Sequence, residues 1–464
     1  MAGSKKYEID MCNGVILPKM LLFAIPLACS SIMQLLFNAA DIIIVGRFAG
    51  DNSLAAVGAN TALIGLLTNL FIGLAVGANV IAARFYGAKD QENLSETVQT
   101  SIVMAAVSGV ILTLIGVVGA RWFLALMQTP PEVLDLATLY LVIYSFGMTA
   151  MMVFNFGSAI LRAAGDTRRP LYYLTAAGIV NVILNIFFVV YVHLGVAGVA
   201  IATVISQFMS GGLVLRCLIH DGGSVTFNPH DLRVNKRKLA QIVHVGLPAG
   251  MQGVLFSLSN VVIQSSINSF GAVAVAGNAA AANVEQFIYF SMNAFYQAVI
   301  SFTSQNYGAG KKDRLLKILV RGLACVVVTG GVMGQTAFFF GRRLLSIYTM
   351  SPAVIDAGIY RMSVISTTYF LCGMMDVMSG AIRGIGYSVI PTVVTLIGAC
   401  GMRFVWIATV FQIPAFHTTR VVYMAYPVTW VLTITAHGIC YYFMYRKIMN
   451  PKNDKLSVIH TGRN

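Results

Sequence analysis

The sequence predicts an all-α integral membrane protein with twelve transmembrane helices in two six-helix lobes, related by a parallel, pseudo-two-fold duplication. Three observations support this fold class. Hydrophobic residues make up 57% of the 464 residues and charged residues only 10%, against about 25% charged in an ordinary soluble domain. Apolar stretches of about 20 residues or more recur along the chain. The second half of the sequence also repeats the pattern of the first.

The apolar stretches number twelve, so both ends of the chain are expected on the same side of the membrane. Several stretches exceed the length that crosses the hydrocarbon, which predicts tilted helices. The expected limits are 17–46, 53–83, 95–119, 133–160, 169–191, 194–218, 240–269, 273–304, 316–340, 354–381, 389–412 and 420–445.

The parts outside the spans are short. The first twenty residues are mixed in character, and the apolar run after them is too long for a signal peptide, so the first helix is expected to remain. The expected organisation is a cytoplasmic N-terminal tail at 1–16, an N-lobe at 17–220 (helices 1–6), a basic cytoplasmic linker at 221–239, a C-lobe at 240–446 (helices 7–12) and a cytoplasmic tail at 447–464.

The basic residues set the orientation. The net charge of +14 comes from short clusters between apolar runs, such as 233–238 and 311–317, which is the pattern of cytoplasmic loops and not of a nucleic-acid-binding surface. With both termini in the cytoplasm, all but seven of the 31 Lys and Arg residues fall on that side. The seven are Arg47, Arg121, Arg342, Arg343, Arg361, Arg403 and Arg420.

The internal repeat has an offset of 221 or 222 residues. FAIPLACSSIMQLLFNAADI at 23–42 aligns with HVGLPAGMQGVLFSLSNVVI at 244–263 and pairs Pro26 with Pro248. GSAILRAAGDTRRP at 157–170 aligns with MSGAIRGIGYSVIP at 378–391. A six-span duplication is typical of transporters, whose binding site lies near the middle of the membrane at the interface of the repeats.

Four segments, in this order, resemble the multidrug and toxic compound extrusion (MATE) family over about residues 15–446. They are Pro26…Asn38-x2-Asp41-x4-Gly46-Arg47, LAAVGA at 54–59, ILRAAGDTRRP at 160–170 and GVAGVAIAT at 195–203. Within the family the chain is most similar to the bacterial branch of DNA-damage-inducible efflux proteins. The resemblance implies a multi-pass protein of the bacterial cytoplasmic (inner) membrane that functions as a monomer.

Three acidic residues lie inside expected spans: Asp41, Glu285 and Asp376. A carboxylate at the centre of a bilayer costs roughly 2.5–3.5 kcal/mol on insertion scales, so each is a candidate functional residue that faces a cavity. The alternative is a structural pair with a buried base. Arg403 and His437 are the nearest candidates for such a base.

Polar residues accompany Asp41 in the first half. Gln34 and Asn38 share its helical face through i, i+4, i+7 spacing, and Asn181 and Asn185 are four residues apart in the fifth span. Thr203 follows in the sixth span, beyond two glycines that allow close helix approach. Hydrogen bonding between helices in lipid is an alternative role for the asparagines.

The family resemblance implies that Asp41, Asn181 and Thr203 bind the coupling proton or sodium ion. Asn185 stands where relatives have a second Asp, which reduces the negative charge of this site. In the second half, Asp376 aligns with Asn155, and Glu285 shares a helix face with Tyr289. The sodium-coupled relatives also use an acid in the tenth span. The candidate cation-coupling residues are therefore Asp41, Asn181, Asn185, Thr203, Glu285 and Asp376.

Soft and aromatic residues surround these polar positions. Methionine and aromatic side chains adapt to irregular apolar cations and offer ring faces to the positive charge. Taken singly, residues of these types lie in the core or face lipid more often than they bind substrate. The candidate substrate-cavity residues are Gln34, Phe37, Asn38, Tyr144, Asn155, Tyr289, Met292 and Tyr369.

Sequence motifs for other chemistry are missing. The chain has no GxxxxGK[ST], helical HExxH or GxSxG pattern, so we expect neither ATP hydrolysis nor another enzymatic activity. The seven cysteines show no paired spacing and predict neither disulfide nor metal site. The only ions expected are transported H⁺ or Na⁺, with sodium at Asp41 or Asp376.

We therefore expect a secondary active multidrug efflux transporter that exports organic cations, such as drugs or dyes, in exchange for protons or sodium ions by alternating access. The alternative is a lipid or lipid-linked oligosaccharide flippase of the same superfamily, which would line its cavity with basic residues. A membrane enzyme or scaffold is a third reading. The sequence leaves open the coupling ion, the physiological substrate, the oligomeric state and which lobe holds the drug.

Overall fold

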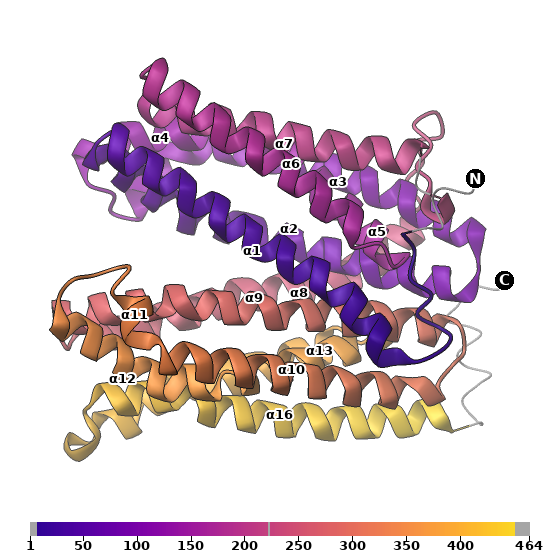
Figure 1. Ribbon diagram of the computed structural model, residues 1–464. Coiled ribbons are helices and arrows are strands. Elements are labelled where there is room, and N and C mark those ends of the chain that lie inside the picture. Colours follow the sequence, from indigo (N-terminus) through magenta and orange to yellow (C-terminus); the bar gives the residue numbers. More distant parts are fainter. Residues whose placement is uncertain (1–6, 221–222, 451–464) are drawn as a thin grey trace. The chain divides into compact units, whose positions relative to one another are not determined.

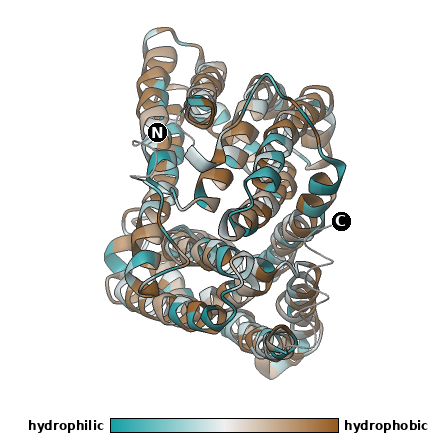
Figure 2. Cartoon of the chain, turned by 90° about the vertical axis from the view of Figure 1, so that its right-hand side faces the viewer, coloured by the Kyte–Doolittle hydropathy of each residue, from teal (hydrophilic) through white to brown (hydrophobic). Residues whose placement is uncertain are grey.

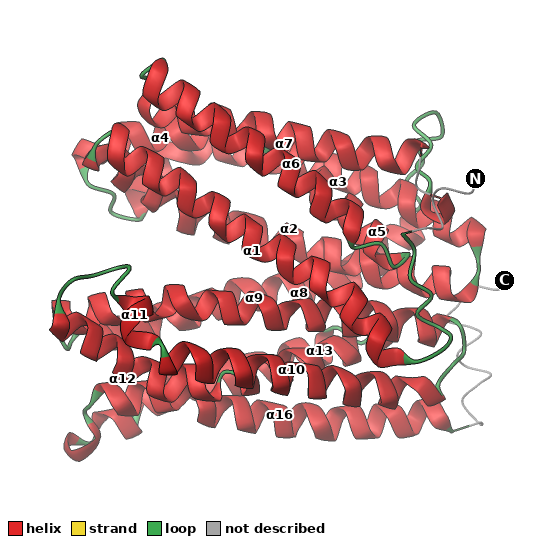
Figure 3. Cartoon of the chain, viewed as in Figure 1, coloured by secondary structure: helices red, strands yellow, loops and turns green. Residues whose placement is uncertain are grey.

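The structure is a computed structural model that describes residues 7–220 and 223–450. Helices make up most of this part, and no strand occurs in it (Figure 3). The helices of the first half are α1 (Ile16–Phe48), α2 (Asp51–Ala88), α3 (Gln91–Leu126), α4 (Pro131–Ser145), α5 (Met148–Ala163), α6 (Arg168–Asn185), the π-helical η2 (Ile186–Tyr191) and α7 (Gly195–His220) (Figure 1).

The second half follows a short 3₁₀ turn, η3 (Gly223–Val225). Its helices are α8 (Lys236–Asn268), α9 (Ala272–Gly308), α10 (Asp313–Phe339), α11 (Gly341–Leu345), α12 (Pro352–Thr368), α13 (Phe370–Ile385), α14 (Val389–Thr395), the π-helical η4 (Leu396–Gly401), α15 (Met402–Ala408), the 3₁₀ turns η5 (Val410–Gln412) and η6 (Pro414–Phe416), and α16 (Thr419–Met449).

The helices account for the expected spans. Within the described residues, eight helical segments are long and apolar enough to cross a membrane, and the bent pair α4 and α5 makes nine. The remaining expected spans correspond to α9, to α12 with α13, and to α16. Figure 2 shows hydrophobic residues predominating along the helices and hydrophilic residues in the connecting segments. The all-helical, twelve-span fold class is confirmed.

Two expected spans are interrupted at positions that the repeat pairs. The span expected at 133–160 consists of α4 and α5, which are bent by 49° where Phe146 and Gly147 separate them. A Cβ on Gly147 would lie 1.9 Å from Oε1 of Gln207, so the break packs closely against α7. The span expected at 354–381 is interrupted at Tyr369.

The chain forms two compact units. Unit 1 comprises the residues up to Met11 and Leu21–Val254, and unit 2 comprises Cys12–Met20 and the residues from Leu255 onward. This division differs from the expected lobes, because the first part of α8 groups with unit 1. The cause is a close crossing of α8 and α2.

Glycines bring α2 and α8 together backbone to backbone. Gly73 and Gly77 of α2 face Gly246 and Gly250 of α8, and both pairs have the GxxxG spacing. A Cβ on Gly73 would lie 2.2 Å from the backbone nitrogen of Gly250, where no side chain fits. Small residues at such a crossing allow the close packing that drives helix association in lipid.

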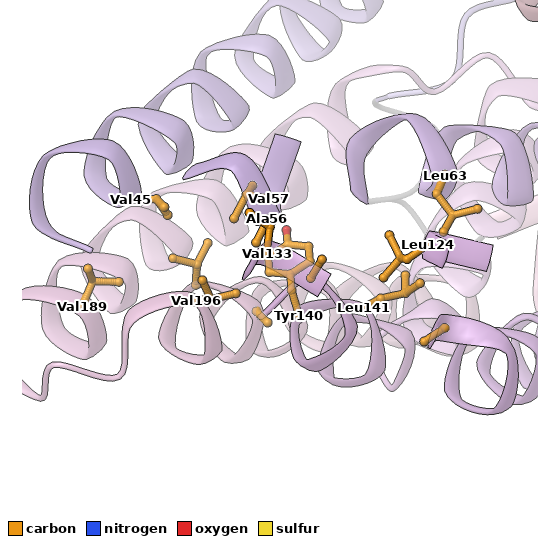
Figure 4. Close-up of a cluster of buried hydrophobic side chains, with 14 of the residues drawn as sticks. Val45, Ala56, Val57, Leu63, Leu124, Val133, Tyr140, Leu141, Val189 and Val196 are labelled. Atoms are coloured by element: carbon orange, nitrogen blue, oxygen red, sulfur yellow. The ribbon is translucent and has the colours of Figure 1, made fainter. Parts of the chain in front are cut away.

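Each unit has its own apolar core. In unit 1 the core is formed by α2, α3, α4, η2, α7 and the end of α1 (Figure 4). Asn60, fully buried on α2, donates hydrogen bonds to the carbonyls of Ala56 (2.8 Å) and Ala137 (2.9 Å) and so joins α2 to α4. In unit 2, Trp430 and Tyr423 of α16 pack with α9, α12, α13 and the end of α8.

The repeat is also visible in helix ends. Gly165 and Gly386, which the sequence pairs, both adopt left-handed backbone conformations, with φ of 94° and 109°. Glycine populates this region without the steric penalty that a Cβ brings. Gly165 lies between α5 and α6, which begins at Arg168. Gly386 lies between α13 and α14, which begins at Val389.

Candidate functional site

The first candidate site is a hydrogen-bonded chain that begins at Asp41. Asp41 lies in the last third of α1, where it is half-buried. Nδ2 of Asn185 donates a hydrogen bond to Oδ1 of Asp41 and another, of 3.2 Å, to Oδ1 of Asn181. Nδ2 of Asn181 donates to Oγ1 of Thr203 at 3.4 Å. We call these four residues the Asp41 network.

Helix geometry explains why the Asp41 network forms. Asn181 and Asn185 lie one turn apart on the same face of α6, and both are buried. Asn185 is the last residue of α6, directly before the π-helical stretch η2. Such π-helical turns are frequent at functional sites. Thr203 on α7 completes the row and donates to the carbonyl of Val199 at 2.9 Å.

The Asp41 network presents oxygen atoms to a cation. Oδ1 of the fully buried Asn185 has no hydrogen-bond partner among the described residues. Carboxylate, amide and hydroxyl oxygens are the ligands that hard cations prefer. No group of three His, Cys, Asp or Glu side chains that could hold a metal ion occurs in the described part of the chain.

Aromatic residues lie beside Asp41 in unit 1. The rings of Tyr140 and Tyr144 stack with their centroids 5.9 Å apart, and both phenols interact electrostatically with Asp41. The hydroxyl of Tyr144 also lies 3.8 Å from Sδ of Met151. Tyr144, a predicted cavity residue, is therefore close to the acid.

The other predicted cavity residues of the first half are spread over α1 and α5. Gln34 and Asn38 are exposed on α1. The ring of Phe37 packs against Gly178 of α6. A Cβ on Gly178 would lie only 1.9 Å from a carbon of this ring. Asn155 donates to the carbonyl of Met151 on its own helix at 2.9 Å. None of these four takes part in the Asp41 network within the described residues.

Glu285 has a different environment. It is 2% exposed, and both Nε (3.1 Å) and Nη2 (2.6 Å) of Arg361 donate to its Oε2. Ser366 donates to Oε1 at 3.1 Å, and Nη1 of Arg361 donates to Asn278 at 2.6 Å. The expectation that Arg403 and His437 are the nearest bases to the span-interior acids is therefore wrong for Glu285.

Sequence reasoning missed Arg361 because it was counted with the residues outside the membrane. The signal was present, because Arg361 falls within the span expected at 354–381. A buried arginine with a matched carboxylate and amide is satisfied by the protein itself. A role of Glu285 in cation coupling stays a prediction, and the observed pairing describes a structural ion pair.

Asp376 on α13 is half-buried, and no hydrogen bond or ion pair reaches its carboxylate from the described part of the chain. It interacts electrostatically with Tyr289 on α9. The ring of Tyr289 lies 6.4 Å from that of Tyr369, which in turn lies 5.5 Å from the ring of Trp430. Three of these four residues were predicted site residues, and the structure brings them into one row.

Met292, the remaining predicted cavity residue, is buried in the packing of unit 2. It is 1% exposed. Its Sδ would lie 2.4 Å from a Cβ on Gly330 and 2.7 Å from one on Gly373, so it fills the space between α10 and α13. This environment is that of a core residue.

Comparison with known proteins places the chain in a family. The family model MatE matches residues 26–187 and again 248–409, so the two matches begin at the paired Pro26 and Pro248. A protein of Bacillus subtilis described as probable multidrug resistance protein YoeA is 26% identical over 92% of this chain and 94% of its own length. The probable multidrug resistance protein NorM of Thermotoga maritima is 25% identical over 81% of each chain.

Solved structures agree in fold. The outward-facing structure of a multidrug resistance MATE family transporter has a TM-score of 0.87 at 20% identity and covers 95% of this chain and 98% of its own. The duplication predicted from the sequence is confirmed, because one family model matches both halves. The branch within the family stays a prediction. The twelve-span fold, the repeat and the two matches together show that this chain is a member of the MatE family of membrane transporters.

Proposed function

We propose that the chain is a secondary active multidrug efflux transporter that exports organic cations in exchange for protons or sodium ions by alternating access. The names of its relatives support multidrug efflux. The observation that carries the exchange is Asp41, an acid in a membrane-spanning helix that accepts a hydrogen bond from the neutral amide of Asn185 and from no base among the described residues.

The chemistry follows from the surroundings of Asp41. A carboxylate in a medium of low dielectric constant favours neutralisation, which a proton, a sodium ion or an organic cation can each provide. If two of these cations exclude one another, each weakens the binding of the other by the same factor, typically about 1–3 kcal/mol. Each charge that enters down a 100 mV potential supplies roughly 2.3 kcal/mol for export. Asp376, which forms no ion pair among the described residues although Arg383 interacts electrostatically with it, is the second acid that we assign to this exchange.

The test is efflux of ethidium from proteoliposomes, first under a sodium gradient and then under a pH gradient. Asp41→Asn keeps the size of the side chain and removes its charge, so we expect coupled efflux to fall at least tenfold. Asp135→Asn is the matched control, because Asp135 lies on the surface in an exposed ion pair with Arg121 at 2.7 Å. Undiminished efflux by the Asp41 variant would exclude Asp41 from the mechanism.

We also propose that both termini face the cytoplasm of a bacterial inner membrane and that a monomer suffices for transport. The bias of Lys and Arg supports this orientation. A green fluorescent protein fused to the C-terminus would fluoresce in this orientation. A dark fusion in a transport-active protein would reverse the topology.

A further inference from the structure

Unit 2 contains a buried guanidinium that forms no ion pair within residues 7–220 and 223–450. Arg403 is 1% exposed and is the second residue of α15, which follows the π-helical stretch η4 directly. Its Nε donates to Oγ1 of Thr429 at 3.4 Å. Both Nη1 and Nη2 lack a hydrogen-bond partner among the described residues, and no carboxylate there lies within ion-pair distance.

Aromatic rings surround Arg403. The guanidinium carbon lies 4.3 Å from the ring centroid of Tyr426 and 5.1 Å from that of Phe256. Ring faces favour a cation but accept no directed hydrogen bond of the strength that a guanidinium donates. They therefore stabilise the charge of Arg403 and leave its four Nη hydrogens unused.

A second unused donor lies next to Arg403. Trp430 is 1% exposed, its ring lies 5.6 Å from that of Tyr426, and its Nε1 has no hydrogen-bond partner in the described part of the chain. Buried donors in folded proteins almost always have an acceptor, which can be water or an ion. Two such residues beside one ring indicate a site for an acceptor that the described residues do not supply.

The balance of charge indicates an anion as this acceptor. Arg361 lies 6.0 Å from the same Tyr426 ring, and its charge is balanced by Glu285. Arg403 adds a positive charge that no carboxylate of the described residues pairs with, and arginine does not lose its proton in proteins. Asp376 is the other nearby acid. Asp376 and Arg403 each interact electrostatically with the Cys372 thiol, but among the described residues they form no ion pair with each other. Water would satisfy the donors but not the charge.

We propose that Arg403 and Trp430 form a buried binding site for a small monovalent anionic group, which is a chloride ion from solution or the carboxylate of a bound molecule. The ring of Tyr426 lies next to both side chains. The proposal concerns unit 2 alone and does not rest on the exchange mechanism, because anion binding is measured without transport.

The experiment uses the purified full-length protein with Trp122→Phe and Trp406→Phe, so that Trp430 is the only indole. The protein is titrated with bromide, as the probe for a halide, and separately with acetate, as the probe for a carboxylate. Each anion replaces sulfate, so that the ionic strength stays constant. We expect a saturable change of Trp430 emission with at least one of the two monovalent anions. Saturation by bromide assigns the site to a halide, and saturation by acetate alone assigns it to a carboxylate.

Variants test whether Arg403 holds the anion. Arg403→Lys keeps the charge but loses the forked donors, so we expect at least tenfold weaker binding, and Arg403→Met should abolish saturation. Arg420→Met removes an exposed arginine of the same unit and should leave the titration unchanged. The anion should also raise the melting temperature of the parent and not that of Arg403→Lys, which tests the site even where Arg403→Met does not fold. A linear, unsaturated response to both anions, or an unaltered titration in Arg403→Lys, would overturn the proposal and leave only water at these donors.

Discussion

Asn185 is the central residue of the Asp41 network because one amide nitrogen serves two acceptors. It donates to the carboxylate of Asp41 on α1 and to the amide oxygen of Asn181 on its own helix. A hydrogen bond to a charged group contributes about 1.5–3 kcal/mol, whereas one between neutral groups contributes about 0.5–1.5 kcal/mol. The hydrogen bond from Asn185 to Asp41 is therefore the strongest in the network, and the hydrogen bond from Asn181 to Thr203 is weaker.

This order predicts a graded effect of substitutions on transport. Asn185→Leu removes the donor to the carboxylate and should reduce coupled efflux by about 10–100-fold. Thr203→Val removes only the neutral end of the network and should reduce it by about 2–10-fold. Ethidium efflux from proteoliposomes gives both rates. Equal losses in the two variants would show that the network does not act through Asp41.

The Glu285–Arg361 pair predicts an effect on stability. Glu285→Gln leaves a buried guanidinium without its counter-charge, which costs about 3–5 kcal/mol, and should lower the melting temperature clearly. Asp356→Asn is the control, because it breaks an exposed pair with Arg342 that contributes at most about 1 kcal/mol. Loss of efflux by Glu285→Gln at unchanged thermal stability would instead support the role in cation coupling.

At the scale of elements, α8 is a helix that the two compact units share. Its first part belongs to unit 1 and the part from Leu255 onward belongs to unit 2, although the helix is continuous. The four glycines at the crossing with α2 explain this, because they leave no room for side chains between the two backbones. The first part of α8 therefore belongs to unit 1 through direct backbone contact with α2.

The crossing predicts that one methyl group will destabilise unit 1. Gly73→Ala places a Cβ against the backbone of α8, and overpacking of this kind costs about 1–3 kcal/mol. Gly58→Ala on the same helix meets nothing within 4 Å and should be neutral or stabilise the helix by up to about 1 kcal/mol. Thermal unfolding in detergent compares the two. Equal melting temperatures would mean that α2 and α8 can move apart at no cost.

At the scale of the molecule, local patterns predicted the spans, the repeat and the shared helix face of Asn181 and Asn185, and the family resemblance linked Asp41, Asn181 and Thr203. Composition and the i, i+4 spacing of Asn181 and Asn185 are properties of short windows, so they are readable without a fold. The pairing of Glu285 with Arg361 joins residues 76 positions apart, and no pattern in one helix indicates it. The unpaired donors of Arg403 were equally hidden, since burial and the lack of an acceptor are known only when all neighbours are placed.

The division of the chain predicts where it can be cut. A break after His230 falls in an exposed segment between α7 and α8, so co-expressed fragments should each keep whole helices and restore dye efflux. A break after Gly253 divides α8, whose two parts belong to different units. The new helix ends would leave up to four N–H and four C=O groups unsatisfied at membrane depth, where each costs several kcal/mol. We therefore expect the second pair of fragments to give less than a tenth of the efflux of the first, measured at equal fragment abundance in the membrane. Equal efflux from the two pairs would show that the continuity of α8 is not needed, and the contacts of its first part with α2 would then be sufficient to hold it.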